Sequence, residues 1–343
     1  MKKVLVLGAG AMGSAFTVPC IDNGNEVTLI GTHLENNSIE EIKSQKNFHK
    51  VLNCRLPERL KVKKFDEFPR ELNNKPDLIV LGVNSKGLDW AGNEISKCYK
   101  KDIPILLLTK GLTIIENKFE TLAEKLNSIL KNNGVKKTNI SAVGGPCLAS
   151  GLANRIKSSV VLANSDLNVV KSIGKIISTD YYSIEYSNDL FGVEICAAIK
   201  NIYSMVIGAS EALCSNEAEK EIKKKNYLNT AASLMYKSIS EMVYFTKNLN
   251  GKEETVYGLA GLGDLYVSSS GGRNSKMGKY LGEGYTYLKA KEKFMPNETI
   301  EGAELALEIG PKILKEFDKD KLSLMMSLID AICNNKKFNF KWS

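Results

Sequence analysis

Histidine is scarce in this chain: its 343 residues contain two, His33 and His49. The seven cysteines form no CxxC pair and no cluster with histidine. These absences argue against a metal site and a disulfide framework, and free thiols indicate a reducing compartment, so we expect a cytoplasmic protein. No run of 18 apolar residues occurs, and we therefore expect no transmembrane span. The apolar run at residues 3–7 leads directly into a glycine motif, which favours a strand over a signal peptide.

Basic residues outnumber acidic residues only modestly. Lysine and arginine number 47 against 39 acidic residues, which gives a formal charge of +8. The basic residues are scattered and form no patch with aromatic residues, so nucleic-acid binding is the least favoured function class. A basic balance suits a small anionic substrate. With 343 residues, 43% of them hydrophobic, the chain is long enough for two domains.

A glycine-rich motif follows the first apolar run. Lys3–Leu7 is typical of a buried strand, and it leads into Gly8-Ala9-Gly10-Ala11-Met12-Gly13. A helix is predicted from there to about Asp22, and a second strand at Glu26–Ile30. A G-x-G-x-x-G motif between a strand and a helix is the arrangement that binds dinucleotides, because the glycines allow a tight turn, close approach of a pyrophosphate and packing of helix against strand. The alternative is a structural glycine turn in an unrelated α/β fold.

The residues after the second predicted strand leave the cofactor undecided between NAD and NADP. An acidic residue about 20 positions after the glycine motif would bind the adenosine ribose of NAD. The strand is followed by Gly31-Thr32-His33-Leu34-Glu35, with no acid at its tip and no arginine to mark NADP. Thr32 and His33 could face a ribose hydroxyl or a 2′-phosphate, or they could be ordinary loop residues.

Five further apolar runs alternate with helical patterns up to residue 187. They predict strands at Asp77–Val83, Ile103–Leu108, Asn139–Val143, Ser159–Ala163 and Tyr182–Tyr186. Beyond them helical periodicity takes over, at 188–213, at about 226–248 and in shorter helices up to residue 333. The sequence therefore predicts an α/β N-terminal domain at 1–187 with a Rossmann-type doubly wound sheet, followed by an all-α C-terminal domain at 188–343.

Polar turns follow two of the predicted buried strands. Asn84-Ser85-Lys86 follows the first of them, and Thr109-Lys110-Gly111 follows the second, more apolar one. Ligands of open α/β sheets bind at the carboxyl ends of the strands, so Lys110 is a candidate site residue. It could equally be a surface lysine in a turn.

One lysine lies within the most apolar helical stretch of the chain, Asn188–Leu213. Lys200 stands between Ile195–Ile199 and the largely apolar Ile202–Ile207. A helix that is apolar nearly all round is usually buried, and a buried ammonium is costly unless it is paired or has a depressed pKa. Such a lysine can transfer a proton near neutral pH. The alternative is that Lys200 extends from a core helix into water.

Glycines are dense in Tyr257–Gly284, within the predicted helical domain. Three of them precede Asp264, and Gly271-Gly272 precedes Arg273-Asn274 at a predicted helix start. A guanidinium, an amide and free backbone N–H groups together make a favourable anion site. The alternative is a packed loop in which Arg273 pairs with Asp264.

Taken together, these motifs resemble the NAD(P)-dependent glycerol-3-phosphate dehydrogenases of bacterial and archaeal type. The resemblance covers essentially the whole chain, and its most diagnostic part is Ala-Gly-Leu-Gly-Asp-Leu at 260–265 followed by Gly-Arg-Asn at 272–274. The motifs that carry it are, in chain order, Gly8–Gly13, Thr109–Gly111, Gly145-Pro146, Gly192–Asn201, Gly258–Asp264, Arg273-Asn274 and Glu301-Gly302.

The resemblance implies hydride transfer between a nicotinamide and C2 of glycerol 3-phosphate or dihydroxyacetone phosphate, in glycerophospholipid synthesis or glycerol metabolism. It implies that Lys200 transfers the proton, that Lys110 polarises the carbonyl or supports Lys200, and that Asp264 orients the lysines or the substrate hydroxyls. The implied substrate-binding residues are Lys110, Gly145, Cys147, Gly272, Arg273 and Asn274. The implied cofactor-binding residues are Gly8, Gly10, Ala11, Met12, Gly13, Thr32, His33, Lys110, Ala149, Arg273, Ile300 and Glu301.

These residue types fit the implied chemistry. As hydride reaches the carbonyl carbon, the oxygen becomes an alkoxide, which a nearby ammonium stabilises and then protonates. Two neighbouring lysines lower each other's pKa, which prepares one of them to act as a base. Binding the phosphate away from the reacting carbon orients the substrate. We expect a small phosphorylated substrate, no metal and a homodimer.

Three positions depart from the family pattern. Cys147 stands where the family usually has serine or threonine, Gly151 where it has glutamate, and Gly272 where it often has serine. The alternatives are a dehydrogenase of another small phosphorylated or carboxylated alcohol, and a nucleotide-binding sensor that has lost turnover. The presence of Lys110, Lys200 and Asp264 favours an active enzyme.

Overall fold

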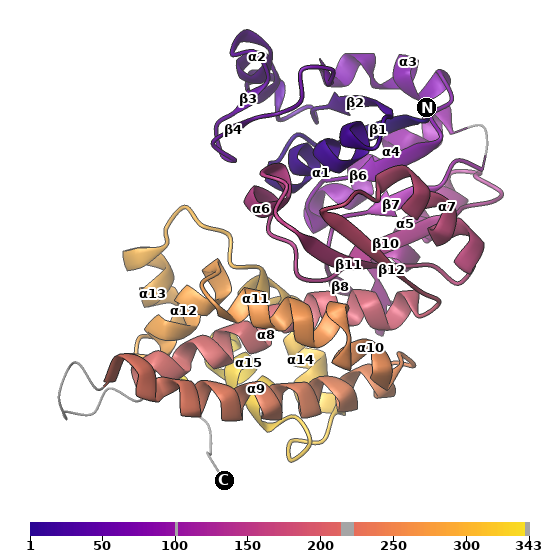
Figure 1. Cartoon of the computed structure of the whole chain (residues 1–343). Coiled ribbons are helices and arrows are strands. Elements are labelled where there is room, and N and C mark those ends of the chain that lie inside the picture. The colour runs from indigo at the N-terminus through magenta and orange to yellow at the C-terminus, as the bar shows by residue number, and fades with distance from the viewer. Residues whose placement is uncertain (100–101, 214–222, 340–343) are drawn as a thin grey trace. The chain divides into compact units, whose positions relative to one another are not determined.

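A computed structural model of the chain describes residues 1–99, 102–213 and 223–339 (Figure 1). The described chain divides into two compact units. Unit 1 comprises Met1–Lys110 and Thr121–Leu190, and unit 2 comprises Gly111–Glu120 and the chain from Phe191 onward. The short segment Gly111–Glu120 therefore belongs with the C-terminal part of the chain, although the sequence pattern assigned it to the N-terminal domain.

Unit 1 is built on an eight-stranded sheet with its first strand near the centre. The strands in spatial order are β12 (Tyr182–Ser187), β11 (Ser158–Ala163), β10 (Ile140–Gly144), β7 (Ile105–Leu107), β6 (Leu78–Leu81), β1 (Lys3–Leu7), β2 (Glu26–Ile30) and β5 (Lys61–Lys63). Neighbouring strands are parallel except for β10 and β11. The strand order reverses direction between β1 and β6, which is where open α/β sheets bind their ligands. This sheet confirms the predicted doubly wound class.

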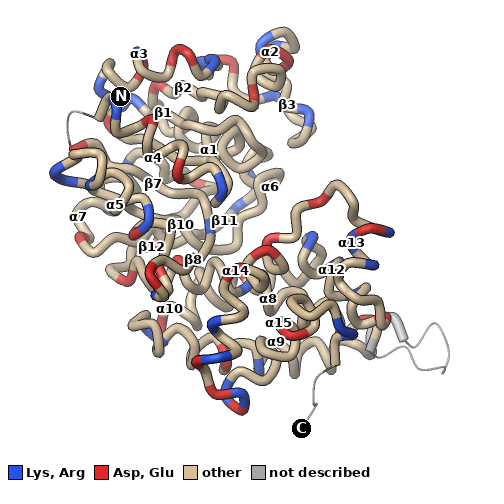
Figure 2. Tube along the Cα trace, turned by 180° about the vertical axis from the view of Figure 1, so that it is seen from behind, with Lys and Arg blue, Asp and Glu red and all other residues tan. Residues whose placement is uncertain are grey.

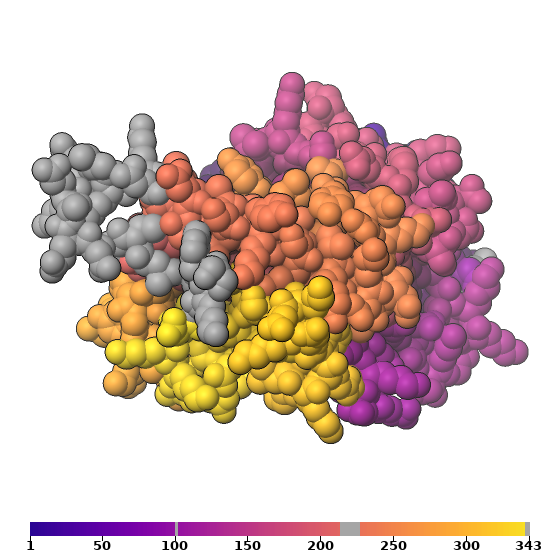
Figure 3. Space-filling model, turned by 90° about the horizontal axis from the view of Figure 1, so that it is seen from below, coloured from indigo at the N-terminus to yellow at the C-terminus, as the bar shows by residue number. Residues whose placement is uncertain are grey.

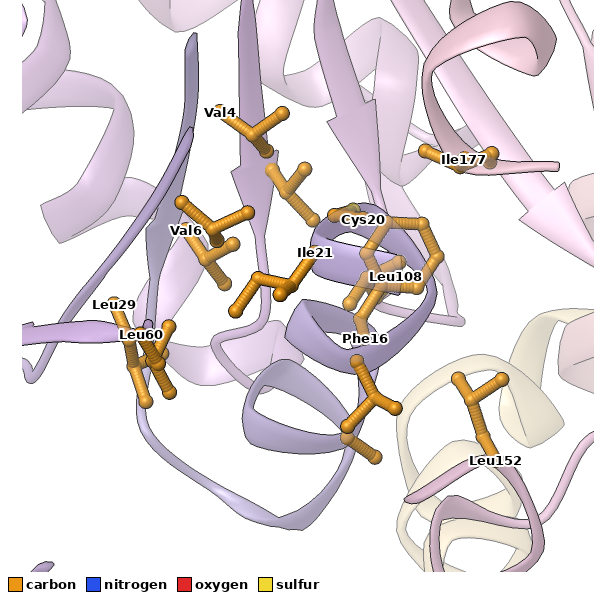
Figure 4. Packing of buried hydrophobic residues seen from close by; sticks show 14 of the residues in the cluster. Val4, Val6, Phe16, Cys20, Ile21, Leu29, Leu60, Leu108, Leu152 and Ile177 are labelled. Carbon is orange, nitrogen blue, oxygen red and sulfur yellow. The ribbon is translucent and has the colours of Figure 1, made fainter. Parts of the chain in front are cut away.

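Helices cover both faces of this sheet. Alternate residues of β1 point to opposite faces: Val4 and Val6 join one apolar cluster, and Leu5 and Leu7 join the other. In Figure 4, Phe16 and Ile21 pack near Val4 and Val6 in the first cluster. The helices that bury residues in the first cluster are α1 (Ala11–Asp22), α2 (Asn36–Ser44), α6 (Ala149–Ala153) and α7 (Leu167–Ile177). Those of the second cluster are α3 (Phe68–Asn73), α4 (Leu88–Cys98) and α5 (Leu122–Asn132).

The connection between β2 and β5 is a long excursion. It contains α2 and a small antiparallel hairpin made of β3 (Phe48–His49) and β4 (Cys54–Arg55). The excursion, residues 31–60, carries the buried His49, which returns toward the glycine-rich turn.

Unit 2 is helical, and the described part of residues 191–339 contains no strand. Its helices are α8 (Leu190–Leu213), α9 (Lys223–Asn248), α10 (Glu253–Tyr257), α11 (Asp264–Ser269), α12 (Arg273–Gly282), α13 (Tyr287–Phe294), α14 (Glu301–Glu316) and α15 (Ser323–Cys333), with a π-helical turn at Leu259–Gly263. In Figure 3, α9, in orange-red, lies beside the yellow C-terminal helices. The predicted helical second region is thus confirmed.

A buried carboxylate ties three of these helices together. Glu241 on α9 is 4% exposed and accepts hydrogen bonds from the backbone N–H groups of Leu324 (2.8 Å) and Met325 (3.0 Å) at the start of α15. The hydroxyl of Tyr203 on α8 donates to the same carboxylate at 3.2 Å. Burial raises the pKa of Glu241, and these hydrogen bonds oppose the rise.

Helix α8 is long and apolar enough to cross a membrane, and it is the only described helix that passes this test of length and composition. In the structure, 83% of its most apolar window is buried within the protein. That degree of burial is typical of a core helix. The sequence contains no continuous run of 18 apolar residues, so it predicts no transmembrane span. The burial of α8 within the protein explains why this helix is so apolar.

Close backbone contacts hold α12 against α8. A Cβ at Gly278 would lie 1.9 Å from the carbonyl oxygen of Met205, and one at Gly208 would lie 2.2 Å from that of Ser275. A side chain at either position would therefore force the two helices apart. Glycines in the stretch 257–284 thus let α12 approach the helix that carries Lys200.

The segment Gly111–Glu120 contains a hairpin that the sequence analysis did not predict, made of β8 (Leu112–Ile115) and β9 (Lys118–Thr121). The turn residues Glu116 and Asn117 have φ angles of +48° and +61°, the conformation that tight hairpins require. The Phe119 ring lies 6.0 Å from that of Phe245 and 5.9 Å from that of Phe317. This aromatic contact explains why the hairpin belongs to unit 2.

Candidate active site

The glycine-rich turn between β1 and α1 has the geometry of a dinucleotide-binding motif. Gly8 has a φ of +109°, which favours glycine, and a Cβ at Gly13 would lie 2.1 Å from the Gly8 carbonyl oxygen. A Cβ at Gly10 would meet only the Glu35 carboxylate, at 3.9 Å, so the space beside Gly10 is open. Helix α1 begins at Ala11 without a side-chain cap. An open glycine surface at an uncapped helix start fits a pyrophosphate.

The turn after β2 contains an acidic residue that the sequence analysis did not expect at the site. The Glu35 N–H donates to the Thr32 carbonyl oxygen at 3.0 Å, which folds the chain back. Oε2 of Glu35 then accepts the N–H groups of Thr32 (2.7 Å) and Ala9 (3.0 Å). The strand tip carries no acid, as predicted, but the turn brings one to the glycine motif. The second candidate in this turn, His33, is exposed, and its ring lies 4.7 Å from that of Trp90.

Candidates of unit 1 at the ends of β7 and β10 lie in short connections. Lys110 is half-buried, three residues after the end of β7, and the neighbouring Thr109 hydroxyl donates to the Val83 carbonyl oxygen at 2.5 Å. Gly145 has a φ of +125°, and a Cβ there would lie 3.1 Å from Cα of Val160. Cys147 and three other candidates share one environment, because they are partly buried apolar residues packed on the first cluster; these are Ala11, Met12 and Ala149.

Lys200 is buried and paired. Lys200 as a whole residue is 6% exposed, and Asp264 is 3% exposed. Nζ of Lys200 donates to Oδ1 of Asp264 and, at 2.8 Å, to the hydroxyl of Ser268. The alternative of a lysine that extends into water is therefore wrong, because Nζ ends on a buried carboxylate.

A second set of hydrogen bonds joins the residue after Lys200 to the starts of α12 and α14. The amide of Asn274, which is 7% exposed, donates to Oδ1 of Asn201 at 3.1 Å. Oδ1 of Asn274 accepts the N–H of Gly302 at 2.9 Å. Next to this contact, Arg273 forms an ion pair with Glu301. The alternative pairing of Arg273 with Asp264 is therefore wrong.

The structure brings most unit 2 candidates together. Asp264, Lys200 and its neighbour Asn201, then Asn274 and Gly302, form one continuous series of contacts. The remaining candidates of this unit adjoin the same helix starts: Gly272 precedes α12, Ile300 precedes α14, and Arg273 and Glu301 are paired. In unit 1, Gly8, Gly10, Ala11, Met12 and Gly13 form the turn described above, and Thr32 is tied to it through Glu35.

Two family models match the two parts of the chain. Residues 3–170 match the model of the NAD-dependent glycerol-3-phosphate dehydrogenase N-terminus, and residues 189–339 match that of the C-terminus. The chain belongs to the NAD-dependent glycerol-3-phosphate dehydrogenase family. The NADP(+)-dependent glycerol-3-phosphate dehydrogenase of Archaeoglobus fulgidus is 32% identical over 315 residues, which cover 90% of either chain. The glycerol-3-phosphate dehydrogenase [NAD(P)+] of Fusobacterium nucleatum is 29% identical, covering 91% of this chain and 88% of that protein.

A solved structure in the same family shares the fold. The crystal structure of glycerol-3-phosphate dehydrogenase from Coxiella burnetii aligns with a TM-score of 0.80 at 22% identity, covering 98% of this chain and 96% of that one. Because its relatives are named for NADP(+) or for NAD(P)+, the cofactor of this family member is NAD or NADP.

Two residues of the helical unit join the candidate site although the sequence analysis did not select them. Ser268 lies one helical turn after Asp264 and accepts a hydrogen bond from Lys200. Asn201 bonds to Asn274. The i, i+4 spacing of Ser268 from Asp264 was a usable signal, because residues four apart share one helix face. For Asn201, its position within the Lys200-Asn201 motif was the only signal.

Proposed function

We propose that this chain interconverts sn-glycerol 3-phosphate and dihydroxyacetone phosphate by hydride transfer with NAD or NADP. The observation that carries the proposal is the buried Lys200–Asp264 pair. Asn201, next to Lys200, accepts a hydrogen bond from Asn274 at the start of α12, and a helix start of this kind can bind an anion. In this proposal the proton-carrying group and the phosphate-binding groups lie in one helical unit. In this proposal residues 1–187 hold the cofactor, and residues 188–343 supply the proton and bind the phosphate.

Lys200 is the proposed proton donor in ketone reduction and the acceptor in alcohol oxidation. When bound, the nicotinamide supplies or accepts the hydride. In reduction the carbonyl oxygen gains negative charge, which the ammonium of Lys200 stabilises before it gives up its proton. The hydride and this proton together convert the C2 carbonyl into the hydroxyl. Asp264 and Ser268 hold Nζ in place, and after transfer Asp264 favours the return of a proton to Lys200.

The start of α12 is the proposed phosphate site. Gly272 precedes this ten-residue helix, and no side chain caps the helix start. The first backbone N–H groups of α12 are therefore left for a ligand. Arg273 adds a guanidinium whose side chain is 51% exposed and whose partner Glu301 is 42% exposed. An ion pair this exposed is weak, so it does not prevent Arg273 from binding a phosphate. Asn274 is held by Asn201 and Gly302, which fixes the helix start.

The remaining roles concern the cofactor and the reacting carbonyl. We assign the pyrophosphate to the turn Gly8–Gly13, which its open surface at Gly10 supports. The ribose end would face Thr32 and His33, and the nicotinamide end would face Ala149, with Ile300, Glu301 and Arg273 on the outer side. Lys110 would polarise the carbonyl or support Lys200, and Gly145 and Cys147 would line the substrate. These assignments come from the family resemblance.

The test is oxidation of NADH or NADPH by the full-length protein with dihydroxyacetone phosphate, followed at 340 nm. We expect substrate-dependent oxidation with at least one nicotinamide. The second candidate is a dehydrogenase of another small alcohol, since an uncapped helix start with an arginine binds carboxylates as well as phosphates. Oxidation with another phosphorylated or carboxylated ketone, but none with dihydroxyacetone phosphate, would contradict the proposal. Cofactor binding without any turnover would favour the sensor alternative.

We also propose that the enzyme works in the cytoplasm as a homodimer. Support for a reducing compartment comes from four described cysteines that are free thiols: Cys20, Cys54, Cys98 and Cys333. Burial raises the pKa of the Cys20 thiol, so this thiol stays protonated. Light scattering coupled to size exclusion measures the mass of the assembly, and a monomer of 37.8 kDa would contradict the dimer.

A further inference from the structure

Two side chains from the excursion between β2 and β5 hold a single residue of the glycine-rich turn. The Ala9 N–H donates to Oε2 of Glu35 at 3.0 Å, and the Ala9 carbonyl oxygen lies 3.1 Å from Nε2 of His49. Ala9 is 3% exposed and His49 is 5% exposed. The family resemblance assigned no role to either His49 or Glu35, so the contacts stand as a separate observation.

The hydrogen bonds of His49 determine which of its nitrogens carries the proton. Nδ1 of His49 accepts the backbone N–H of Leu52 at 3.2 Å. A neutral imidazole with an acceptor at Nδ1 carries its hydrogen on Nε2. His49 therefore donates to the Ala9 carbonyl oxygen. The Ser14 hydroxyl donates to the same oxygen at 3.1 Å, so both lone pairs of this carbonyl are used.

We propose that His49 and Glu35 are positioning residues that orient the Ala9–Gly10 peptide for the cofactor pyrophosphate. The described chain contains no cis peptide bond. In a trans peptide the C=O and the following N–H point in opposite directions. Holding the Ala9 carbonyl toward His49 and Ser14 thus turns the Gly10 N–H the other way. It also keeps a carbonyl dipole from facing the phosphates, which it would repel.

Glu35 holds the Gly8–Ala9 peptide and connects the glycine-rich turn to the turn after β2. Its Oε2 accepts the Ala9 N–H and the Thr32 N–H at once. A carboxylate with two N–H donors makes charge-assisted bonds, which are stronger than neutral ones. The bonds join the phosphate-binding turn to the turn after β2, so the two parts of the site that meet a dinucleotide are held in register. This inference rests on the proposed function, because it assigns a purpose to the same cofactor site.

The proposal predicts which variants weaken the cofactor and which do not. His49→Leu removes the donor to Ala9, and we expect the Kd and KM for the nicotinamide cofactor to rise about tenfold, with kcat and the KM for dihydroxyacetone phosphate nearly unchanged. His49→Gln keeps an N–H donor and should recover most of this loss. Leu60→Ala is the matched control: Leu60 is buried at the end of the same excursion and its N–H donates to the Pro57 carbonyl oxygen, so this variant should lower the Tm and leave cofactor affinity unchanged.

Glu35→Ala is the second variant, and it keeps the proposal testable should His49→Leu fail to fold. It should also weaken the cofactor about tenfold, and the double variant should lose less than the product of the single losses, because both act through Ala9. Titration of NADH fluorescence measures these affinities with the full chain. Equal affinities of wild type and His49→Leu, or equal losses in His49→Leu and His49→Gln, would overturn the inference. If wild type binds NADH but does not reduce dihydroxyacetone phosphate, the proposed function fails while the affinity series still tests the positioning role.

Discussion

Lys200 and Asp264, 64 positions apart in the chain, form an ion pair whose two side chains are 8% and 4% exposed. Helix α8 supplies the lysine and the first residue of α11 supplies the carboxylate. Burying two charges costs solvation energy that their attraction must offset, so a buried pair contributes little to stability by itself. The proposed proton transfer by Lys200 would account for the presence of this pair in the core of unit 2.

Replacing Lys200 tests this directly. Lys200→Met keeps the apolar stem and removes the proton carrier, so we expect kcat to fall by at least about 10³-fold while NADH affinity stays the same. The variant removes one partner of a buried ion pair, which should cost about 3–5 kcal/mol of stability. Steady-state kinetics, NADH titration and urea unfolding measure the three quantities. Near-normal turnover would refute the role of Lys200.

The double variant Lys200→Met with Asp264→Asn separates stability from catalysis. It replaces both charges by neutral groups, so the free energy of unfolding should return toward that of the wild type. The kcat should stay at the level of Lys200→Met, because the proton carrier is still missing. Recovery of both quantities would show that Lys200 acts only through folding.

Asp264→Asn alone tests whether the carboxylate positions the lysine. Asparagine keeps the shape and an acceptor oxygen but removes the charge, so we expect kcat to fall about 100-fold with a smaller change in KM. Ser268→Ala removes the second acceptor of Nζ and should cost about tenfold. A larger loss in Ser268→Ala than in Asp264→Asn would reverse this assignment.

The candidates for proton transfer and phosphate binding stand out in the sequence because each lies in an unusual local pattern. Lys200 interrupts an apolar helix, and Arg273-Asn274 follows a pair of glycines. The sheet was predictable for a related reason: buried parallel strands such as β6, with all four residues buried, appear as short continuous apolar runs. Local sequence was therefore sufficient to predict features that lie within a single helix, strand or turn.

Contacts between distant segments could not be predicted in this way. Glu35 reaches Ala9 only because the turn at Thr32 folds the chain back, and His49 reaches it through a two-residue strand. The hairpin at residues 112–121 was missed because its strands are only four residues each, and β9 has a single apolar residue, Phe119. Its turn at Glu116-Asn117 gave a weak signal, since asparagine favours positive φ but glutamate does not.

In Figure 2, basic and acidic residues are interspersed along the trace, as the scattered charges of the sequence suggested.

Arg273→Ala tests the phosphate site. Removing the guanidinium should raise the KM for dihydroxyacetone phosphate between about 10-fold and 100-fold, with a smaller effect on kcat. Glu301→Gln is the control, because it removes the partner of Arg273 and leaves the guanidinium in place. We expect this variant to change the substrate KM less than threefold, as the pair is exposed. An unchanged KM in Arg273→Ala would count against a phosphate contact.

His33→Arg tests whether the turn after β2 meets the adenosine ribose. NADP differs from NAD by a 2′-phosphate, which a guanidinium binds with two parallel hydrogen bonds. We expect the ratio of kcat/KM for NADPH to that for NADH to rise about tenfold, equivalent to about 1.4 kcal/mol. Leu34→Arg is the matched control, because it adds the same charge one position away, at a residue that is 82% exposed. Equal shifts in both variants would indicate a general effect of charge rather than a contact at residue 33.

Gly278→Ala tests the close approach of α12 to α8. A Cβ there would lie 1.9 Å from the Met205 carbonyl oxygen, so α12 must move away from the helix that carries Lys200. We expect a loss of about 3 kcal/mol in the free energy of unfolding, and a lower kcat because the Asn201–Asn274 contact depends on the same packing. Urea unfolding and steady-state kinetics measure the two effects.

Gly151→Ala is the control for this last variant. Gly151 also lies in a helix, but a Cβ there would meet its nearest neighbour at 3.8 Å, an ordinary contact. The added methyl group should change stability by no more than about 1 kcal/mol, and in the stabilising direction, because alanine restricts the unfolded chain more than glycine does. Similar stabilities of the two variants would mean that α12 can shift without cost. The position of Arg273 and Asn274 relative to Lys200 would then not depend on the glycines of α12.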